Sequence, residues 1–236
     1  MIIGEGADGL AWGCYPMVPY AGRVRNARLE FAGRRFDLPR RQPPHAIHGT
    51  VFEKSWTIED RSESRCRLTT DLQPGWPFAG RVEHEIELHP DRLVMRLTAT
   101  ARETMPIQLG WHPWFVKPND RRLAFARIHR RDAAGIASHE TEAATIGPDG
   151  SNDDCFSEPD GILRLTIGDR ELVLSSSCRC WVVYDEPSHA TCVEPQSGPP
   201  NGVNDDPFVL VAGRTTSEYF TISWSSTPFQ DNPKKP

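Results

Sequence analysis

Hydrophobic and polar side chains alternate with a period of two along most of the chain. In residues 92–100 (RLVMRLTAT), Leu93, Met95 and Leu97 fall on one side and mostly polar residues fall on the other, as in a half-buried strand. Residues 81–88 (RVEHEIEL) alternate in the same way, with His84 on the apolar side. A His-Pro-Asp turn separates the two segments, so we expect them to form a hairpin.

The same pattern returns in three other segments: residues 27–39 (ARLEFAGRRFDLP), 162–175 (ILRLTIGDRELVLS) and 218–226 (EYFTISWSS). The first two carry a glycine-containing turn in the middle, which predicts two further hairpins. No segment shows a period of 3.6 over three helical turns. The pattern therefore predicts an all-β fold in which antiparallel strands form a β-sandwich.

The length of 236 residues suits one large domain, since β-sandwiches of this size usually form a single unit. We expect that domain to cover residues 1–228. The last eight residues, 229–236 (FQDNPKKP), are polar and rich in proline, and we expect them to form a flexible tail.

Composition narrows the class of protein. Hydrophobic residues make up 38% and charged residues 25% of the chain, as in soluble globular proteins. The net charge of -5 argues against nucleic-acid binding through bulk charge. Four Arg-Arg pairs, at 34–35, 40–41, 121–122 and 130–131, are interspersed with acids and favour solvated surface, although one pair could hold a phosphate group.

The first ten residues carry no basic segment followed by an apolar one, and the apolar stretches are too short to cross a bilayer, so neither a signal peptide nor a membrane partner is expected. Six cysteines without a secretion signal are expected to remain thiols in the cytoplasm.

Four polar or proline-rich segments interrupt the strand pattern and carry groups that can do chemistry. They contain Arg23, His48, His112 and the pair Glu194 and Gln196. Pro195 forces Glu194 toward an extended backbone, and an inward-facing carboxylate at the end of a strand would have a raised pKa and could act as a base. Taken singly, each group also fits an interpretation without function: a glutamate exposed to solvent, or a core histidine with its hydrogen bonds made.

A metal site is not expected. His45 and His48 have the spacing HxxH, but on a loop this spacing does not put both rings on one face. The cysteines of Cys178-Arg179-Cys180 lack zinc-finger spacing, and His84 is expected to be structural.

The aromatic residues near these polar groups suggest a sugar ligand, whose C–H faces stack on rings while its hydroxyls need polar partners. The candidate rings are Tyr20, Trp111, Trp114 and Phe115, and the candidate polar partners are Arg23, His48, Asp153 and Gln196. The alternative is that the rings fill the core of the sandwich, which several of the seven tryptophans must do.

Taken in order, the segments resemble the aldose 1-epimerase (galactose mutarotase) family, and in particular its bacterial aldose-epimerase-like branch. The resemblance rests on PYAGRVRNARL, HAIHG, HPWF, DDCF and EPQSGPPNGVN. It implies a supersandwich fold and interconversion of sugar anomers without a cofactor. It also implies a role for each matched residue: Glu194 as catalytic base, His112 as catalytic acid, and His48, Arg23, Asp153 (or Asp154) and Gln196 as substrate-binding residues.

The chain departs from the family pattern at two positions. Gly22 stands where an asparagine usually precedes the arginine, and Asn201 lies near the place where many members have aspartate. The expected substrate is a free aldohexose such as glucose or galactose, bound by a monomer or weak homodimer. The alternatives are a hexose 6-phosphate substrate, a carbohydrate-binding protein without activity, and a metal-dependent isomerase that uses His45, His48 and His112.

Overall fold

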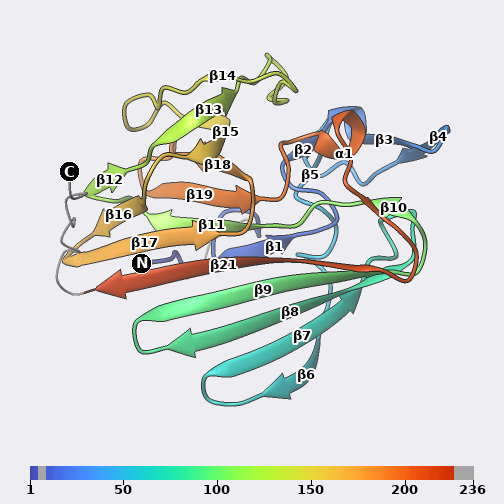
Figure 1. The fold of residues 1–236 in the computed structure, drawn as a ribbon, viewed down its shortest axis with the longest axis horizontal. Coiled ribbons are helices and arrows are strands. Elements are labelled where there is room, and N and C mark those ends of the chain that lie inside the picture. Colours follow the sequence, from blue (N-terminus) through green and yellow to red (C-terminus); the bar gives the residue numbers. More distant parts are fainter. Residues whose placement is uncertain (5–8, 226–236) are drawn as a thin grey trace, which may run out of the picture.

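The computed structural model describes residues 1–4 and 9–225, and two large antiparallel sheets pack face to face in it (Figure 1). This arrangement confirms the predicted β-sandwich. The first sheet has seven strands in the order β1 (Cys14–Met17), β11 (Gly110–Val116), β19 (Ala190–Gln196), β18 (Cys180–Tyr184), β15 (Asp153–Pro159), β13 (Phe125–His129) and β14 (Glu142–Ala143). The second has eight strands in the order β12 (Asp120–Arg122), β16 (Leu163–Ile167), β17 (Arg170–Ser176), β21 (Thr215–Ser225), β9 (Arg92–Ala101), β8 (Gly80–His89), β7 (Arg65–Asp71) and β6 (Thr57–Arg61).

Three strand pairs lie at one end of the sandwich (Figure 1). They are β2 (Arg23–Val24) with β5 (Ala46–Ile47), β3 (Arg28–Phe31) with β4 (Arg34–Asp37), and β10 (Met105–Pro106) with β20 (Val209–Leu210). The helices of the described residues are the short segments η1 (Arg25–Ala27) and α1 (Gly202–Asp205). None of the helices in the described part of the chain is long and apolar enough to cross a membrane. The predicted tail, 229–236, lies outside the described residues.

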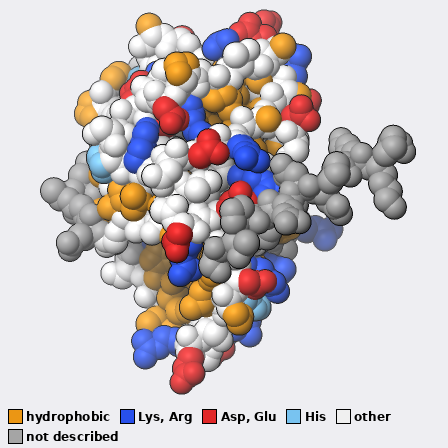
Figure 2. Space-filling view, turned by 90° about the vertical axis from the view of Figure 1, so that its left-hand side faces the viewer, with side chains coloured by type: hydrophobic (Ala, Val, Ile, Leu, Met, Phe, Trp, Pro, Cys, Tyr) orange, Lys and Arg blue, Asp and Glu red, His pale blue; other side chains and the backbone are white. Residues whose placement is uncertain are grey.

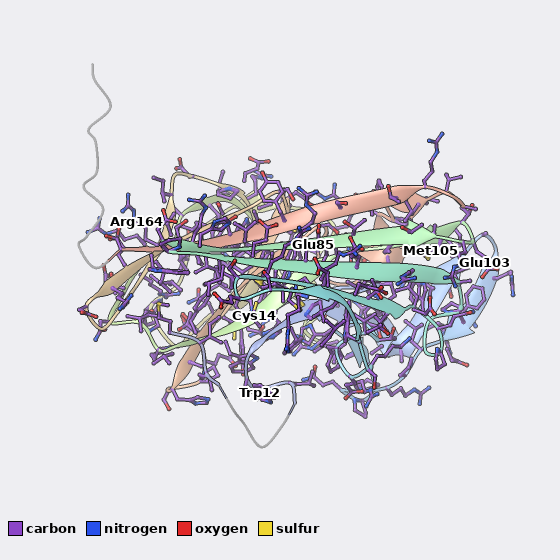
Figure 3. All side chains as sticks on the ribbon, turned by 90° about the horizontal axis from the view of Figure 1, so that it is seen from below. Trp12, Cys14, Glu85, Glu103, Met105 and Arg164 are labelled. Carbon is purple, nitrogen blue, oxygen red and sulfur yellow. The ribbon has the colours of Figure 1, made fainter. Side chains whose placement is uncertain are left out.

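The three predicted hairpins form as β8–β9, β3–β4 and β16–β17, and residues 218–225 of the last predicted strand lie in β21. The register of β8 with β9 places His84 opposite Leu97, so both side chains face the interior between the sheets. Figure 3 shows the long strands seen from below, with Arg164 near one end of the sandwich and Met105 near the other. Alternation thus decides which side of each strand is buried.

Aromatic side chains from both sheets meet in the core. Trp111 of β11 and Trp181 of β18 approach Phe220 of β21, with ring centroids 6.0 Å and 6.1 Å away. The indole nitrogen of Trp111 donates a hydrogen bond to Nε2 of His84, at 3.2 Å. His84 is therefore the structural histidine that we expected, and burial lowers its pKa to about 4, which keeps the ring neutral as an acceptor.

The surface carries charges of both signs. On the face shown in Figure 2, basic and acidic side chains are interspersed, and many of the described arginines form ion pairs with acids, such as Arg65 with Glu85. Such exposed pairs contribute little to stability, so the fold rests on the buried aromatic and aliphatic layer.

Candidate active site

One row of directly opposed residues crosses the seven-stranded sheet and organises the site. Tyr15 of β1 lies opposite His112 of β11. The register of β11 with β19 aligns residue 110 with 196 and 114 with 192, which sets His112 opposite Glu194. Glu194 in turn lies opposite Val182, and Val182 lies opposite Cys155 of β15. Because opposed residues of an antiparallel sheet point to the same face, these side chains share the face turned away from the core.

His112 and Glu194 are in direct contact. Nε2 of His112 lies 3.2 Å from Oε1 of Glu194, and both side chains are almost fully buried. The second carboxyl oxygen, Oε2, accepts a hydrogen bond from Nε2 of Gln196 at 3.2 Å. Glu194 lies within strand β19 rather than at its lip, and its side chain is buried on the outer face of the sheet.

Burial shifts the pKa values of this pair in opposite directions. Desolvation raises the pKa of Glu194 well above its ordinary value, helped by the nearby charge of Asp153. Desolvation lowers the pKa of His112 to about 3. These shifts favour the neutral pair, a carboxylic acid beside an imidazole, over the ion pair of carboxylate and imidazolium; both forms hold one proton.

Aromatic rings fix the orientation of His112. The ring stacks on Tyr15 at 4.9 Å and on Trp114 at 5.3 Å between centroids. His48 meets it edge-on at 4.7 Å. His48 adopts a left-handed backbone with φ of 58°, a strained conformation of the kind that clusters at functional sites. The glycine of this His-Gly motif is required, because a Cβ on Gly49 would lie 2.1 Å from a backbone oxygen.

These residues line a cavity of about 610 Å³, within the range of small-molecule sites. Its walls include every predicted site residue except one: Arg23, His48, His112, Trp114, Asp153, Glu194 and Gln196. The exception is Trp111, whose prediction as a substrate-binding residue was wrong. It neighbours His112 on the strand and therefore points to the opposite face, where it is fully buried in the core. Tyr20 and Phe115 are core residues as well.

The polar end of the cavity is built from an arginine and an aspartate of different strands. Arg23 is placed by the pairing of β2 with β5, where it lies opposite Ile47. Its Nη1 lies 3.8 Å from Oδ2 of Asp153, and its Nε donates to Gln42 at 3.1 Å. Arg131 also pairs with Asp153. Burial raises the pKa of Asp153, and the two arginines oppose that rise.

Both candidate aspartates reach the cavity, because Asp154 lines it beside Asp153. Asp153 is two residues from Cys155 and so shares its face of the strand, and it is the one paired with Arg23. These contacts favour Asp153 over Asp154 as the substrate-facing acid.

The two departures from the family pattern have a structural reason. Gly22 has φ of +67°, and a Cβ there would lie 2.6 Å from Cγ of Pro200, so an asparagine would not fit. Asn201 is occupied in holding its loop, since its Oδ1 accepts from the backbone nitrogen of Arg25 at 3.0 Å and its Nδ2 donates to Asp205 at 2.9 Å.

Sequence reasoning missed several residues of the cavity wall: Tyr15, Gln42, Arg131, Tyr184 and Glu186. Arg131 belongs to one of the Arg-Arg pairs, which was its only signal. Tyr15 lies on a short strand with apolar neighbours, and its position beside His112 follows only from the pairing of β1 with β11.

A metal ion can be held in the same place. Nitrogens of His48 and His112 and a carboxyl oxygen of Glu194 lie within 4.8 Å of one another. His45, the third member of the predicted histidine set, is not in this group, because its Nδ1 accepts a hydrogen bond from the backbone nitrogen of Asn26 at 3.0 Å. The metal-dependent alternative had named His45, His48 and His112 as ligands. In the structure Glu194 takes the place of His45 in this group.

A family model for aldose 1-epimerase matches residues 6–217. The chain belongs to the aldose 1-epimerase family. This agrees with the resemblance drawn from the sequence motifs, and the sandwich of the described residues agrees with the fold that the family implied.

Two curated relatives and one solved structure illustrate the match. The chain is 32% identical over 121 residues to the uncharacterized protein YphB of Escherichia coli, covering 48% of this chain and 40% of that protein. It is 29% identical over 100 residues to galactose mutarotase of Mus musculus, covering 40% of this chain and 29% of that enzyme. The chain thus spans less than half the length of both relatives. A GalM/aldose epimerase homologue from C. elegans shares the fold, with a TM-score of 0.80 at 14% identity over 94% of this chain and 84% of that one.

Proposed function

We propose that the protein is an aldose 1-epimerase that interconverts the α and β anomers of a free aldohexose such as glucose or galactose. The observation that carries this proposal is the contact of 3.2 Å between His112 and Glu194 on the wall of a sugar-sized cavity. An acid–base pair in such a place suits proton transfer at a hemiacetal. A protein that only binds sugar has no need of one.

The reaction opens the sugar ring, rotates the C1–C2 bond and closes the ring on the other face of the carbonyl. Opening removes the proton from O1 and delivers a proton to the ring oxygen O5. Glu194 as carboxylate takes the O1 proton and His112 as imidazolium gives one to O5. Closure reverses both transfers, so the enzyme ends each turnover with the protons that it began with.

Burial of the pair supplies the proton that this scheme needs. The reactive form, a carboxylate beside an imidazolium, holds one proton, which is the same number as the neutral pair. Transfer of that proton along the short contact between Glu194 and His112 converts one form into the other. Gln196, which donates to Glu194, stabilises the carboxylate form.

The remaining cavity residues suit a neutral sugar. Trp114 and Tyr15 offer aromatic faces. Nδ1 of His48 and Oε1 of Gln196 are buried and have no hydrogen-bond partner among the described residues. Both residues line the cavity, so a bound sugar hydroxyl would supply the missing partner. The arginines of the cavity are already neutralised. Arg23 pairs with Asp153, Arg131 pairs with both Asp153 and Glu186, and Arg41 pairs with Glu53 outside the cavity. This compensation favours a free aldohexose over the alternative of a hexose 6-phosphate, which needs unpaired positive charge.

The test is mutarotation of fresh α-D-glucose, α-D-galactose and glucose 6-phosphate, followed by polarimetry or by anomeric proton NMR. Wild type should accelerate the free sugars, and Glu194→Gln should reduce the rate by roughly 10²–10⁴-fold, the usual contribution of a positioned proton transfer. Exposed Glu63 provides the matched control, and Glu63→Gln should retain full activity. A wild-type protein that binds these sugars without accelerating mutarotation would refute the proposal in favour of a binding protein.

The same assay, repeated after treatment with a chelator, tests the metal-dependent alternative. We expect the rate to survive, because the scheme uses only side chains. Monomeric or weakly dimeric assembly and a cytoplasmic location stay predictions.

A further inference from the structure

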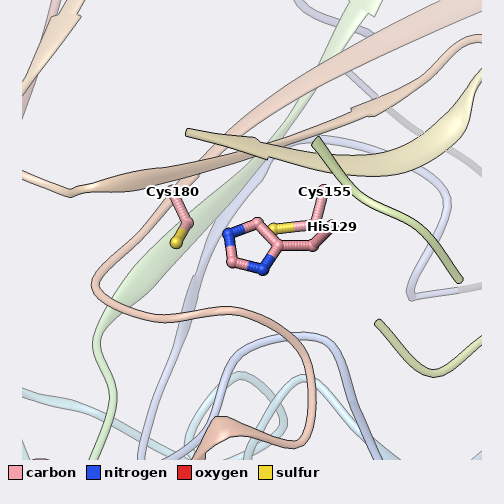
Figure 4. A group of neighbouring side chains, drawn as sticks. All are labelled: His129, Cys155 and Cys180. Atoms are coloured by element: carbon pink, nitrogen blue, oxygen red, sulfur yellow. The ribbon is translucent and has the colours of Figure 1, made fainter. Parts of the chain in front are cut away.

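A second group of reactive side chains continues the row of the active site. His129 of β13 lies opposite Cys155, the residue at the end of the row that contains His112 and Glu194. Cys180 of β18 points to the same face. Figure 4 shows the ring of His129 between the two sulfurs. The ring nitrogen and the two sulfurs lie within 4.8 Å of one another, and the three residues are 8%, 2% and 2% exposed.

The imidazole of His129 is held in one tautomer. Its Nδ1 lies 3.1 Å from the backbone oxygen of Ser138, to which it donates its hydrogen because a carbonyl oxygen can only accept. Nε2 is then the unprotonated nitrogen, and it is turned toward the sulfurs and the hydroxyl of Ser157, at 3.4 Å. Histidines that bind metals are usually oriented by such a hydrogen bond from the other ring nitrogen.

Strand register argues against a disulfide between the two cysteines. Cys155 lies opposite Val182, while Cys180 lies opposite Ser157, so the two cysteines are diagonal neighbours. Diagonal positions are typically about 7–8 Å apart between Cα atoms, beyond the usual range of about 4.4–6.8 Å for a disulfide. All six cysteines, which lie within the described residues, are thiols.

The same separation suits ligands that share one metal ion. Zinc binds sulfur at about 2.3 Å and nitrogen at about 2.0–2.1 Å, so neighbouring ligand atoms around it lie roughly 3–4 Å apart. The three ligand atoms lie within 4.8 Å of one another, close to this spacing. Two thiolates would also neutralise the charge of the ion, which a buried position requires.

We propose that His129, Cys155 and Cys180 form a zinc site that ties together strands β13, β15 and β18. A set of one nitrogen and two sulfur donors binds zinc in preference to hard cations such as Mg²⁺ and Ca²⁺. On binding, the two thiol protons leave to solvent and the sulfurs coordinate as thiolates.

The position of the site gives it a role. Cys155 lines the sugar cavity and lies two residues after Asp153 on the same face of β15, while β18 pairs with β19, the strand that carries Glu194. A zinc ion at this place would fix the edge of the cavity wall. The inference stands on the cluster itself and does not depend on mutarotase activity.

The experiment is a titration of the reduced, chelator-treated full chain with ZnCl₂, followed by calorimetry and by metal analysis after gel filtration. Wild type should retain one zinc per chain. Cys180→Ser and His129→Gln should each weaken binding by more than the roughly 10–100-fold that loss of a mere supporting contact produces. Cys178→Ser is the matched control, because Cys178 is also buried but lies outside the cluster, and this variant should bind zinc as wild type does.

Two further measurements keep the outcome unambiguous. Glu194→Gln should retain zinc; loss of zinc in this variant together with retention in Cys180→Ser would place the metal among His48, His112 and Glu194 and overturn the proposal. Cobalt(II) added to the wild-type protein should produce a sulfur-to-cobalt charge-transfer band, a readout that does not depend on whether the variants fold. Absence of both zinc retention and this band would also overturn the proposal, whatever the result of the mutarotation assay.

Discussion

The raised pKa of Glu194 makes a prediction about stability that is independent of substrate. The folded pKa of this group lies well above its ordinary value, whereas in the unfolded chain it should be about 4.3. A group with a raised folded pKa contributes stability that is complete below the unfolded pKa and is lost as pH rises toward the folded pKa. Wild type should therefore lose stability with rising pH relative to a variant that cannot ionise at this position.

Glu194→Gln is that variant. The amide oxygen can still accept from Gln196, and its nitrogen can donate to Nε2 of His112, so the substitution imitates the protonated carboxyl. Between the unfolded and folded pKa values, wild type binds one more proton folded than unfolded, which corresponds to about 1.4 kcal/mol per pH unit. Over the part of the range from pH 5.5 to pH 7.5 that lies below the folded pKa, the free energy of unfolding of the variant should gain up to this amount per pH unit relative to wild type.

His112 does not confuse the comparison. Its folded pKa of about 3 lies below the unfolded value of about 6.5, so its contribution is present above the unfolded pKa and is lost as pH falls. Its contribution therefore changes with pH in the opposite direction and cannot imitate the expected loss of stability as pH rises.

The assay is urea unfolding followed by tryptophan fluorescence at pH 5.5, 6.5 and 7.5, with Glu63→Gln as the exposed carboxylate-to-amide control. The difference between Glu194→Gln and wild type should grow steadily with pH, and the control should stay parallel to wild type. Parallel curves for Glu194→Gln and wild type would refute the reasoning, because they would mean that the buried pair holds no proton at neutral pH.

Two predictions concern residues that shape the site without reacting. Gly22→Ala should lower the free energy of unfolding by roughly 1–3 kcal/mol in the same urea assay, because its left-handed backbone and its contact with Pro200 leave no room for a Cβ; an unchanged midpoint would contradict this. Trp111→Phe should destabilise the protein by about 1–3 kcal/mol, because it leaves the buried Nε2 of His84 without its donor. The KM for sugar should stay close to that of wild type. A raised KM with unchanged stability would instead show that Trp111 contacts the substrate.

Local pattern was sufficient for most of the strands but not for the site. The hairpins formed by β8 with β9 and by β16 with β17 depend on alternation and on the turn between neighbouring segments. Alternation and turn can both be recognised within one continuous stretch of sequence. Tyr15 and Arg131 became visible only with the fold, because their place beside His112 and Asp153 depends on pairing between distant strands. The cluster of His129, Cys155 and Cys180 was missed for the same reason.

The error at Trp111 shows how a single position on a strand decides between core and site. Both tryptophans flank the same histidine closely, and composition treats them alike. Period-two geometry separates them, because Trp114 is two residues from His112 and shares its face, whereas Trp111 is one residue away and does not. The prediction assumed that both tryptophans lie on the same side as His112. It did not apply to this motif the alternation that had been used for the other strands.

Strand register therefore links the stability of this protein to its chemistry. On β11, Trp111 and Phe115 are fully buried between the sheets, and the cavities left by displacing them would make a slip of the strand costly. A slip by one residue would turn His112 into the core and Trp111 into the cavity. The aromatic core thus holds His112 opposite Glu194, and the same register extends through Val182 to Cys155 and His129. The residues that perform the proposed chemistry and those of the proposed zinc site are placed by one set of strand pairings, which explains why an apolar strand with few polar residues can carry the most demanding part of the site.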